Sequence, residues 1–172
     1  MSITIPAFDP LSIPITGTNL IEASAGTGKT YGIAALFTRL VVLEQMPVES
    51  ILTVTFTKAA TAELKTRLRA RLDEVLQALE SVEDTDNLSD DLAAYCRDNH
   101  PGDVFLTGLL KQALAQESRA RLIVRLKAAI GQFDNAAIYT IHGFCQRILR
   151  DYAFLCRAPM DVELTKDNHN RL

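Results

Sequence analysis

Residues 19–30 read NLIEASAGTGKT, a short apolar run followed by small residues, glycines, a lysine and a threonine. The pattern predicts a strand at Leu20 and Ile21, then a tight loop, then a buried helix that continues through residues 31–43. Small residues let the backbone N–H groups of such a loop converge on an anion, and the helix N-terminus adds partial positive charge. The stretch therefore predicts a phosphate-binding loop.

The residues of this loop have distinct expected roles. Lys29 is expected to reach the β- and γ-phosphates of a nucleotide, and the Thr30 hydroxyl to hold one coordination position of Mg²⁺. Compared with G-x-x-x-x-G-K-[ST], the first position is alanine instead of glycine. The alternative is a glycine-rich turn before a buried helix. The expected nucleotide site comprises Ala23, Ser24, Ala25, Gly26, Thr27, Gly28, Lys29 and Thr30.

Composition sets limits on the class of protein. The 172 residues are 48% hydrophobic, which is enough for one domain with a real core. A net charge of −3 argues against nucleic-acid binding by bulk charge, although a local basic groove would not show in that sum. The three cysteines lack metal-ligand spacing, and there is no signal or membrane-spanning segment. We expect a soluble cytoplasmic protein with reduced thiols and no membrane partner.

The remaining pattern predicts an α/β fold. Residues 51–56 read ILTVTF, a strand covered on both faces, and residues 136–140 form a third short strand before another helical stripe. We expect a P-loop NTPase fold of the RecA type, with a parallel sheet flanked by helices. The helices over residues 76–131 add no strand, so they predict an inserted helical subdomain between 1–75 and 132–172. They could instead form an outer layer of the same domain.

Charge is unevenly distributed around these helices. Residues 73–103 contain ten acidic residues and one basic residue, which indicates a surface insertion, whereas residues 111–127 contain five basic residues and one acidic residue. In the preceding helix, Lys65 with Arg69 and Arg67 with Arg71 are i,i+4 pairs beside a leucine stripe. We interpret these four side chains as solvated flanks of the helix.

Three corners between a strand and a helix are expected to lie together. Right-handed crossovers place every such corner of a parallel sheet at the same edge, where ligands bind. The corners are residues 23–30, 55–58 and 140–144. Hydroxyls and Lys58 suit backbone phosphates, and Phe56, His142 or Phe144 suit base stacking. For each residue taken singly, a core or helix-start role is equally compatible with the pattern.

The motifs LIEASAGTGKT, TVTFTKAATAELKTRL and YTIHGFCQRILR, in this order, resemble the RecB family of helicase–nuclease subunits. More broadly they resemble the first motor domain of superfamily 1 DNA helicases. The resemblance implies that residues 26–30 bind Mg·ATP, with Lys29 and Thr30 in catalytic roles. It also implies that Thr57 and Lys58 bind the DNA backbone, and that His142 and Phe144 lie near the bases. The implied partners are single-stranded DNA, duplex DNA ends, and RecC-like and RecD-like subunits.

Two departures from the superfamily pattern are visible. No glutamine precedes Gln45 to read adenine, so the lead-in around Phe8, Asp9 and Pro10 is the candidate to cover the base. No apolar run ends in Asp-Glu, and no second lobe supplies an arginine finger, both of which hydrolysis needs. We therefore expect the chain to be an N-terminal fragment that binds Mg·ATP without hydrolysing it.

Other functions remain open from the sequence. Within the superfamily, a helicase–nuclease of the AddA type or a repair helicase of the UvrD type is the alternative. A small-molecule kinase or a nucleotide-binding adaptor would not bind DNA. The acidic residues 73–103 could also act as an interaction surface, although acidic loops are usually only solvated. The basic residues 111–127, with Arg121 and Arg125, are the candidate contact to duplex DNA.

Overall fold

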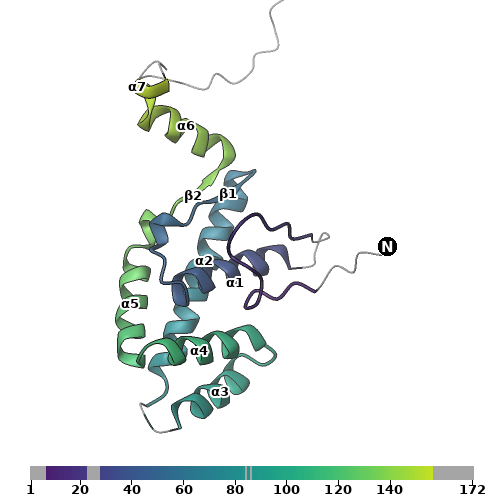
Figure 1. Ribbon diagram of the computed structural model, residues 1–172, viewed down its shortest axis with the longest axis vertical. Coiled ribbons are helices and arrows are strands. Elements are labelled where there is room, and N and C mark those ends of the chain that lie inside the picture. The colour runs from purple at the N-terminus through teal and green to yellow at the C-terminus, as the bar shows by residue number, and fades with distance from the viewer. Residues whose placement is uncertain (1–6, 23–27, 84, 86, 157–172) are drawn as a thin grey trace, which may run out of the picture.

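The computed structural model describes residues 7–22, 28–83, 85 and 87–156. These residues form an elongated, mostly helical molecule (Figure 1), with α6 at one end, the pair α3 and α4 at the other, and α2 running between them. The elements are α1 (Lys29–Val42), η1 (Val48–Ser50), β1 (Thr53–Thr55), α2 (Lys58–Glu80), α3 (Leu88–Asn99), α4 (Val104–Gln116), α5 (Arg119–Gly131), η2 (Phe133–Asn135), β2 (Ile138–Thr140), α6 (Ile141–Asp151) and α7 (Ala153–Cys156).

The sheet of the described residues has two parallel strands. β1 and β2, the second and third predicted strands, pair in a register that sets Thr53 against Ile138 and Thr55 against Thr140. The strand predicted at Leu20 and Ile21 is not formed, and these side chains are 84% and 39% exposed. A β-strand needs backbone hydrogen bonds to a neighbouring strand. Among the described residues, no third segment pairs with β1 or β2. That part of the prediction was wrong.

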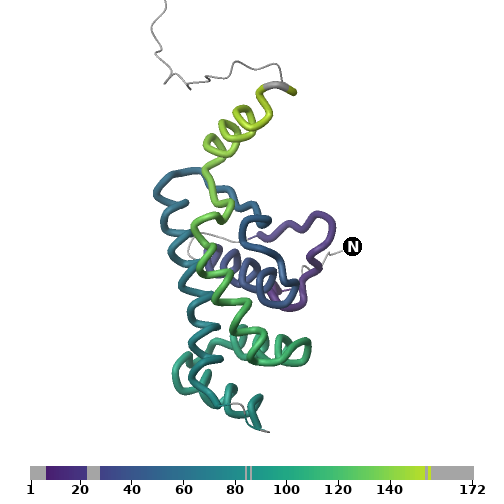
Figure 2. Tube along the Cα trace, turned by 90° about the vertical axis from the view of Figure 1, so that its left-hand side faces the viewer, coloured from purple at the N-terminus to yellow at the C-terminus, as the bar shows by residue number. Residues whose placement is uncertain are grey.

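The long helix α2 is the centre of the core. The predicted leucine stripe is buried at Leu64, Leu68, Leu72 and Leu79, and α1, α3 and α5 pack against this helix. Each fully buried leucine contributes roughly 1.5–3 kcal/mol. Figure 2 shows α5 running beside α2, both crossed by α1. The helix predicted over residues 31–43 is found as α1, but its burial is confirmed for one side only, since Tyr31 and Ile33 are 48% and 42% exposed.

Residues 76–131 contribute helices to this core. α3, α4 and α5 cover the segment, and no strand occurs in its described part, as the pattern predicts. Their buried residues join one cluster with those of α1 and α2, and α2 continues without interruption past residue 75. Whether these helices form a subdomain of their own stays a prediction.

Arginines hold several carbonyl groups that helices and loops leave without partners. Arg125 donates to the carbonyls of Val41 and Val42 at the end of α1, at 2.5 and 2.7 Å. Arg119 Nε donates to the Leu79 carbonyl near the end of α2 at 2.7 Å. The last carbonyls of a helix lack partners within the helix, so these bonds cap the C-terminal ends of α1 and α2. They also fix α5 against α1 and α2.

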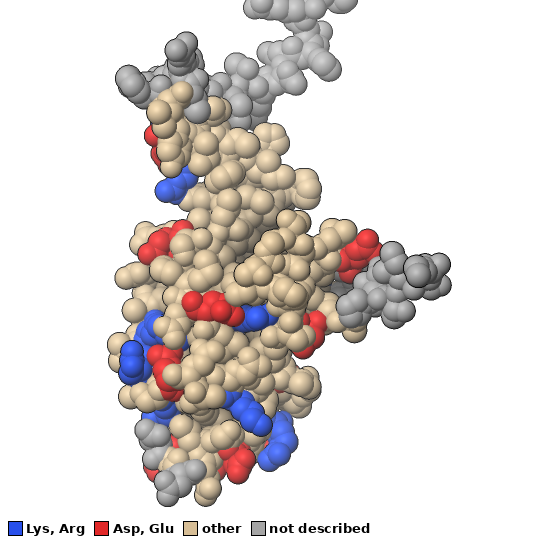
Figure 3. Space-filling view, viewed as in Figure 1, with Lys and Arg blue, Asp and Glu red and all other residues tan. Residues whose placement is uncertain are grey.

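On the face shown in Figure 3, charged side chains gather mainly over the half that contains α3, α4 and α5, whereas the half around the sheet and α6 shows fewer of them. On β1 and its flanks, Leu52, Val54 and Phe56 alternate along one face and are 49%, 46% and 86% exposed. The strand is found, but the prediction that it is covered on both faces was wrong among the described residues. α6 has no buried residue at all. None of the described helices combines the length and apolar character needed to cross a bilayer.

Candidate functional site

The predicted phosphate loop is only partly described. Ala23, Ser24, Ala25, Gly26 and Thr27 lie outside the described residues. Gly28 immediately precedes α1 with a φ of 85° and a ψ of 23°, in the left-handed region that favours glycine. Lys29 follows as the first residue of α1 and is exposed, and Thr30 is half-buried. This backbone conformation at Gly28 is compatible with the predicted phosphate loop and equally with a glycine-rich turn before a buried helix, so the loop stays a prediction.

The start of α1 is electrically suited to an anion. Its first turn contains no acidic residue, and the helix N-terminus carries partial positive charge next to the Lys29 ammonium. A hydroxyl, Thr30, stands in the same turn. An ammonium, backbone donors and a hydroxyl are the groups that hold a phosphate and its Mg²⁺, so the described residues fit a magnesium–nucleotide complex.

The lead-in packs along α1, from Gly32 near its start to Arg39 in its last turn. A side chain at Gly32 would place its Cβ 3.0 Å from Cε1 of Phe8, so the Phe8 ring rests almost directly on the helix backbone. Arg39 Nη1 donates to the carbonyls of Pro10 and Ile13 at 3.1 and 2.7 Å. The lead-in is therefore clamped to α1 at two places.

A pocket of ≈ 540 Å³ lies between the lead-in and the chain that approaches the phosphate loop. Its lining includes Phe8, Asp9, Leu20 and Ile21. Hydrogen bonds from the Ser12 hydroxyl and from a backbone amide hold the pKa of Asp9 below its usual value. The pocket therefore combines apolar walls with two carboxylates, Asp9 and Glu22, of which Asp9 accepts hydrogen bonds from the protein.

The second corner is built by threonines. Thr57 Oγ1 accepts a hydrogen bond from the Ala60 amide at 3.1 Å and so caps α2. Thr61 Oγ1 lies 2.5 Å from Thr55 Oγ1 and donates to the Thr57 carbonyl at 2.9 Å. Lys58, the first residue of α2, is exposed. Thr57 is exposed, and a hydroxyl that accepts one hydrogen bond can still donate another.

The third corner repeats this arrangement. Thr140 Oγ1 accepts from the Gly143 amide at 3.0 Å and caps α6. His142 is exposed in the first turn, whereas Phe144 is half-buried. The Phe144 ring stacks on Tyr139 of β2, with centroids 6.5 Å apart and planes inclined by 29°. The Phe144 ring therefore lies against Tyr139, and the more exposed ring of this corner belongs to His142.

Sequence reasoning did not single out Tyr139 and Arg147. The Arg147 guanidinium carbon lies 5.3 Å from the Tyr139 ring centroid, and Arg147 also bonds the Tyr139 hydroxyl and Asp151. The available signal was the i,i+3 spacing of Phe144 and Arg147. It could not be used because their common neighbour, Tyr139, comes from the preceding strand.

β1 and β2 bring the second and third corners together. Thr55 and Thr140 are paired at the carboxyl ends of the strands, so α2 and α6 both begin at this edge. Two capped helix N-termini, Lys58 and His142 thus share one edge of the sheet. The predicted convergence is found for these two corners, whereas the first corner is not attached to the sheet through a strand among the described residues.

The basic residues 111–127 divide into two groups. Arg119 and Arg125 are engaged with backbone carbonyls, and Lys127 pairs with Glu80 at 2.7 Å. Lys111 and Arg121 are exposed. Arg125 is therefore unsuitable as a duplex contact, since its guanidinium holds the end of α1. That is a correction to the sequence-based interpretation, which grouped Arg125 with Arg121.

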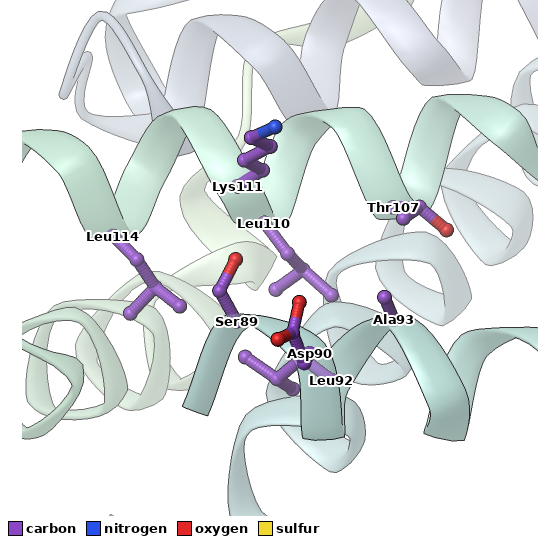
Figure 4. A pocket seen from close by; sticks show the side chains of 8 residues that line it. All are labelled: Ser89, Asp90, Leu92, Ala93, Thr107, Leu110, Lys111 and Leu114. Atoms are coloured by element: carbon purple, nitrogen blue, oxygen red, sulfur yellow. The ribbon is translucent and has the colours of Figure 1, made fainter. Parts of the chain in front are cut away.

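A small pocket of ≈ 190 Å³ lies between α3 and α4 (Figure 4). Its floor is apolar, with Leu92, Leu110 and Leu114, and Ser89 and Asp90 stand at its rim. The Lys111 ammonium points away from Asp90 in this view. No polar groups converge in it, and we interpret it as a gap in helix packing.

A family model of the UvrD/REP helicase N-terminal domain matches residues 9–171. The chain therefore belongs to the UvrD/REP helicase family. Its relatives include the RecBCD enzyme subunit RecB of Haemophilus influenzae, which is 41% identical over 179 residues, covering 100% of this chain and 14% of the relative. RecB of Escherichia coli K12 is 39% identical over 175 residues, covering 97% and 13%. RecB of Mycolicibacterium smegmatis is 38% identical over 141 residues, covering 82% and 11%.

The chain spans 14% or less of the length of these three relatives. The family resemblance inferred from the motifs is thus confirmed over the whole chain. The match therefore concerns a small part of each relative, and the family is what it shows.

Proposed function

We propose that this chain is the ATP-binding, DNA-gripping lobe of a helicase and exonuclease subunit that acts in double-strand break repair and recombination. The observation that carries the proposal is the shared edge of β1 and β2, where Thr57, Lys58 and His142 meet. Membership of the UvrD/REP helicase family and the sequence GTGKT support it. A kinase or adaptor would not bind DNA, so that alternative gives no role to the second and third corners.

The nucleotide is ATP with Mg²⁺, held by residues 23–30. Lys29 binds the β- and γ-phosphates as a point charge, and Thr30 Oγ1 serves as a Mg²⁺ ligand. The bound Mg²⁺ supplies charge neutralisation at the phosphates. Phe8 and Asp9 of the lead-in would cover the base, with the Phe8 ring as an apolar contact and the Asp9 carboxylate as an acceptor for an amine such as that of adenine. This arrangement would take the place of the missing glutamine.

The DNA strand lies across the edge formed by the second and third corners. Its phosphates accept hydrogen bonds from the Thr57 hydroxyl, and Lys58 adds a salt-dependent attraction. His142 contacts a base, and Phe144 supports this contact through its stack with Tyr139. Contacts to phosphate and to base faces recognise a strand without reading its sequence, which suits a motor.

Hydrolysis needs an acidic residue to hold Mg²⁺ and position water, and an arginine from a second lobe. In this proposal both come from outside the chain, as does the nuclease site, and the chain alone binds ATP without turnover. Single-stranded DNA, duplex ends, and RecC-like and RecD-like subunits are the proposed partners. Among the basic residues, Lys111 and Arg121 are the proposed contacts to duplex DNA.

The decisive experiment measures ATP hydrolysis by the full-length product of this reading frame, with and without single-stranded DNA. Strong stimulation by DNA that disappears in Lys29→Ala is expected. Lys65→Ala is the matched control, because Lys65 lies on α2 and pairs with Asp134 at 3.7 Å, away from both corners. Hydrolysis that is indifferent to DNA would favour the kinase or adaptor instead.

A further inference from the structure

Arg71, in the middle of α2, is a charged residue inside the core. It is 8% exposed, which overturns its interpretation as a solvated flank, whereas the neighbouring pair of Glu63 and Arg67 is found at the surface at 2.7 Å. Arg71 Nη1 lies 2.5 Å from Asp103 Oδ2 and 2.6 Å from Glu74 Oε2. Burial of an ion costs several kcal/mol unless partners compensate it. The groups around Arg71 must therefore compensate the burial of its charge.

The Arg71 cluster joins three helices. Asp103 caps α4, because its Oδ1 accepts a hydrogen bond from the Leu106 amide at 3.0 Å. The same carboxylate accepts a hydrogen bond from the Tyr31 hydroxyl at 3.4 Å. Tyr31 stands in the first turn of α1, two residues after Lys29. One guanidinium therefore meets the start of α1 and the start of α4 from the middle of α2.

Aromatic rings complete the surroundings of Arg71. Its Cζ lies 5.7 Å from the Tyr31 ring centroid and 5.3 Å from that of Phe105. Two of its nitrogens, Nε and Nη2, have no hydrogen-bond partner among the described residues. Aromatic faces attract a desolvated guanidinium. Tyr31 is thus held twice, through its ring and through its hydroxyl, although it is 48% exposed.

The other end of this connection is the second corner. α2 begins at Lys58 and continues without a break through Arg71, a distance of about 20 Å at 1.5 Å per residue. A packed, continuous helix transmits a displacement of its first turn along its length. A shift of the Thr57–Lys58 corner would therefore move the guanidinium against Tyr31, and so against the turn that contains Lys29 and Thr30.

We infer that Arg71 is a positioning residue that couples nucleotide binding at the start of α1 to DNA binding at the start of α2. The inference rests on the proposed function, since it assumes that these two starts are the two sites. Such coupling is reciprocal: DNA changes the affinity for nucleotide by the same factor by which nucleotide changes the affinity for DNA. Neither ligand touches Arg71.

The test is calorimetry on the full-length product with Mg²⁺ and the non-hydrolysable analogue AMP-PNP, with and without an oligo-dT strand. The ratio of the two dissociation constants for AMP-PNP measures the coupling. In the unmodified protein we expect a ratio that differs from one by about fivefold or more. In Arg71→Lys and Tyr31→Leu it should move toward one, because lysine lacks the planar fork and leucine lacks both contacts.

Ile33→Ala is the matched control, because Ile33 is a similarly exposed residue on the same helix and should leave the ratio unchanged. Tyr31→Leu keeps the test valid if Arg71→Lys fails to fold. A role confined to stability would lower the free energy of unfolding, measured by urea denaturation, without altering the ratio. Unchanged ratios in both variants, or a ratio of one in the unmodified protein, would overturn the inference alone. AMP-PNP binding that survives Lys29→Ala would overturn the proposed function and the inference with it.

Discussion

At the scale of single residues, the informative positions are those where one side chain or its absence fixes a local geometry. Gly28 adopts a φ of 85° where the chain enters α1. Arg125 and Asp103 hold helix ends that would otherwise lack partners. Each makes a prediction that does not depend on the rest of the proposal.

Gly28→Ala should destabilise the protein by about 1–2 kcal/mol, because alanine resists the left-handed conformation. The cause is backbone strain and not crowding, since a Cβ there would meet only Tyr31 Cβ at 3.9 Å. Urea denaturation measures the change. Gly131→Ala is the control: Gly131 ends α5 with open space around it, and its replacement should not destabilise. Equal effects of the two substitutions would contradict the assignment.

Arg125→Ala should lower the free energy of unfolding by about 2–4 kcal/mol, because two helix-end carbonyls and a charged partner lose their donor. The partner is Glu117, whose side chain is 8% exposed. Thermal or urea unfolding gives the change. Arg121→Ala, at an exposed position on the same helix, should cost little. If Arg125→Ala were as mild, the capping role would be refuted.

Asp103→Asn tests the buried ion cluster through pH. Burial acts to raise the pKa of Asp103, but hydrogen bonds from Arg71 and from the Leu106 amide hold it below its usual value. A depressed folded-state pKa stabilises the protein above the unfolded value of about 3.9. This contribution is lost as pH falls through the folded-state pKa. The stability advantage of the unmodified protein over Asp103→Asn should therefore be full at neutral pH and vanish at strongly acidic pH.

A stability difference between these two proteins that does not vary between neutral and strongly acidic pH would contradict this account. Unfolding curves at several pH values measure it. The Asn oxygen can still accept the Leu106 amide, so the α4 cap survives. The Asn NH2 group then faces Arg71 in place of Oδ2, so the substitution removes both the charge and the acceptor of the guanidinium.

At the scale of elements, the two helix starts at the sheet edge have the same construction. Thr57 and Thr140 each accept a hydrogen bond from the amide of the third helical residue, Ala60 in α2 and Gly143 in α6. The caps orient the first turn of each helix. For Thr57, the proposed function adds a contact to DNA, so one side chain would serve both stability and binding.

Thr57→Val should cost about 1 kcal/mol of stability, the usual value of an N-cap, and should weaken single-stranded DNA binding by the full-length product. Thr57→Ser should retain most of both properties, because the hydroxyl persists. Urea denaturation and fluorescence anisotropy with a labelled oligo-dT measure them. Thr66→Val, an exposed threonine later in α2 that bonds the Ala62 carbonyl, should leave DNA binding unaltered. An unaffected Thr57→Val variant would exclude both roles.

Periodicity in the sequence was enough to find most of these elements. The leucine stripe predicts α2, the apolar run ILTVTF predicts β1, and the end of a helix at Gly131 is confirmed by α5. Strand pairing was harder, because Leu20 and Ile21 satisfy the local pattern of a strand but pair with no neighbour among the described residues. A local pattern does not contain its pairing partner.

The candidate site was predictable in its motifs and unpredictable in its supports. Lys58 and His142 stand at the corners where the pattern places them. The roles of Arg39, Arg71 and Arg125 depend on carbonyls and carboxylates far away in the chain, such as Asp103 for Arg71. The spacing of residues along a helix does not show whether an arginine faces solvent or a partner that is distant in the chain. For this reason the spacing indicated only a solvated arginine.

At the scale of the whole molecule, packing is unevenly distributed. α2 has residues of the core along most of its length, whereas α6 has no buried residue. The two proposed DNA-contacting corners therefore begin helices with very different support. Few buried contacts mean a small free energy of local opening.

Amide hydrogen exchange on this chain should show the difference directly. Amides of α6 should exchange at least tenfold faster than those in the middle of α2, because opening α6 exposes little buried surface. Mass spectrometry of peptides covering the two helices measures the rates. Comparable protection of α6 and α2 would mean that α6 is supported by contacts other than those described.

The contacts of Phe8 with α1 and of Arg39 with the carbonyls of Pro10 and Ile13 fix the lead-in before any ligand is present. Ordering a segment removes conformational entropy, and here that loss belongs to folding. A ligand that contacted Phe8 or Asp9, as we propose for the base, would therefore lose less entropy on binding than one that had to order a free terminal segment.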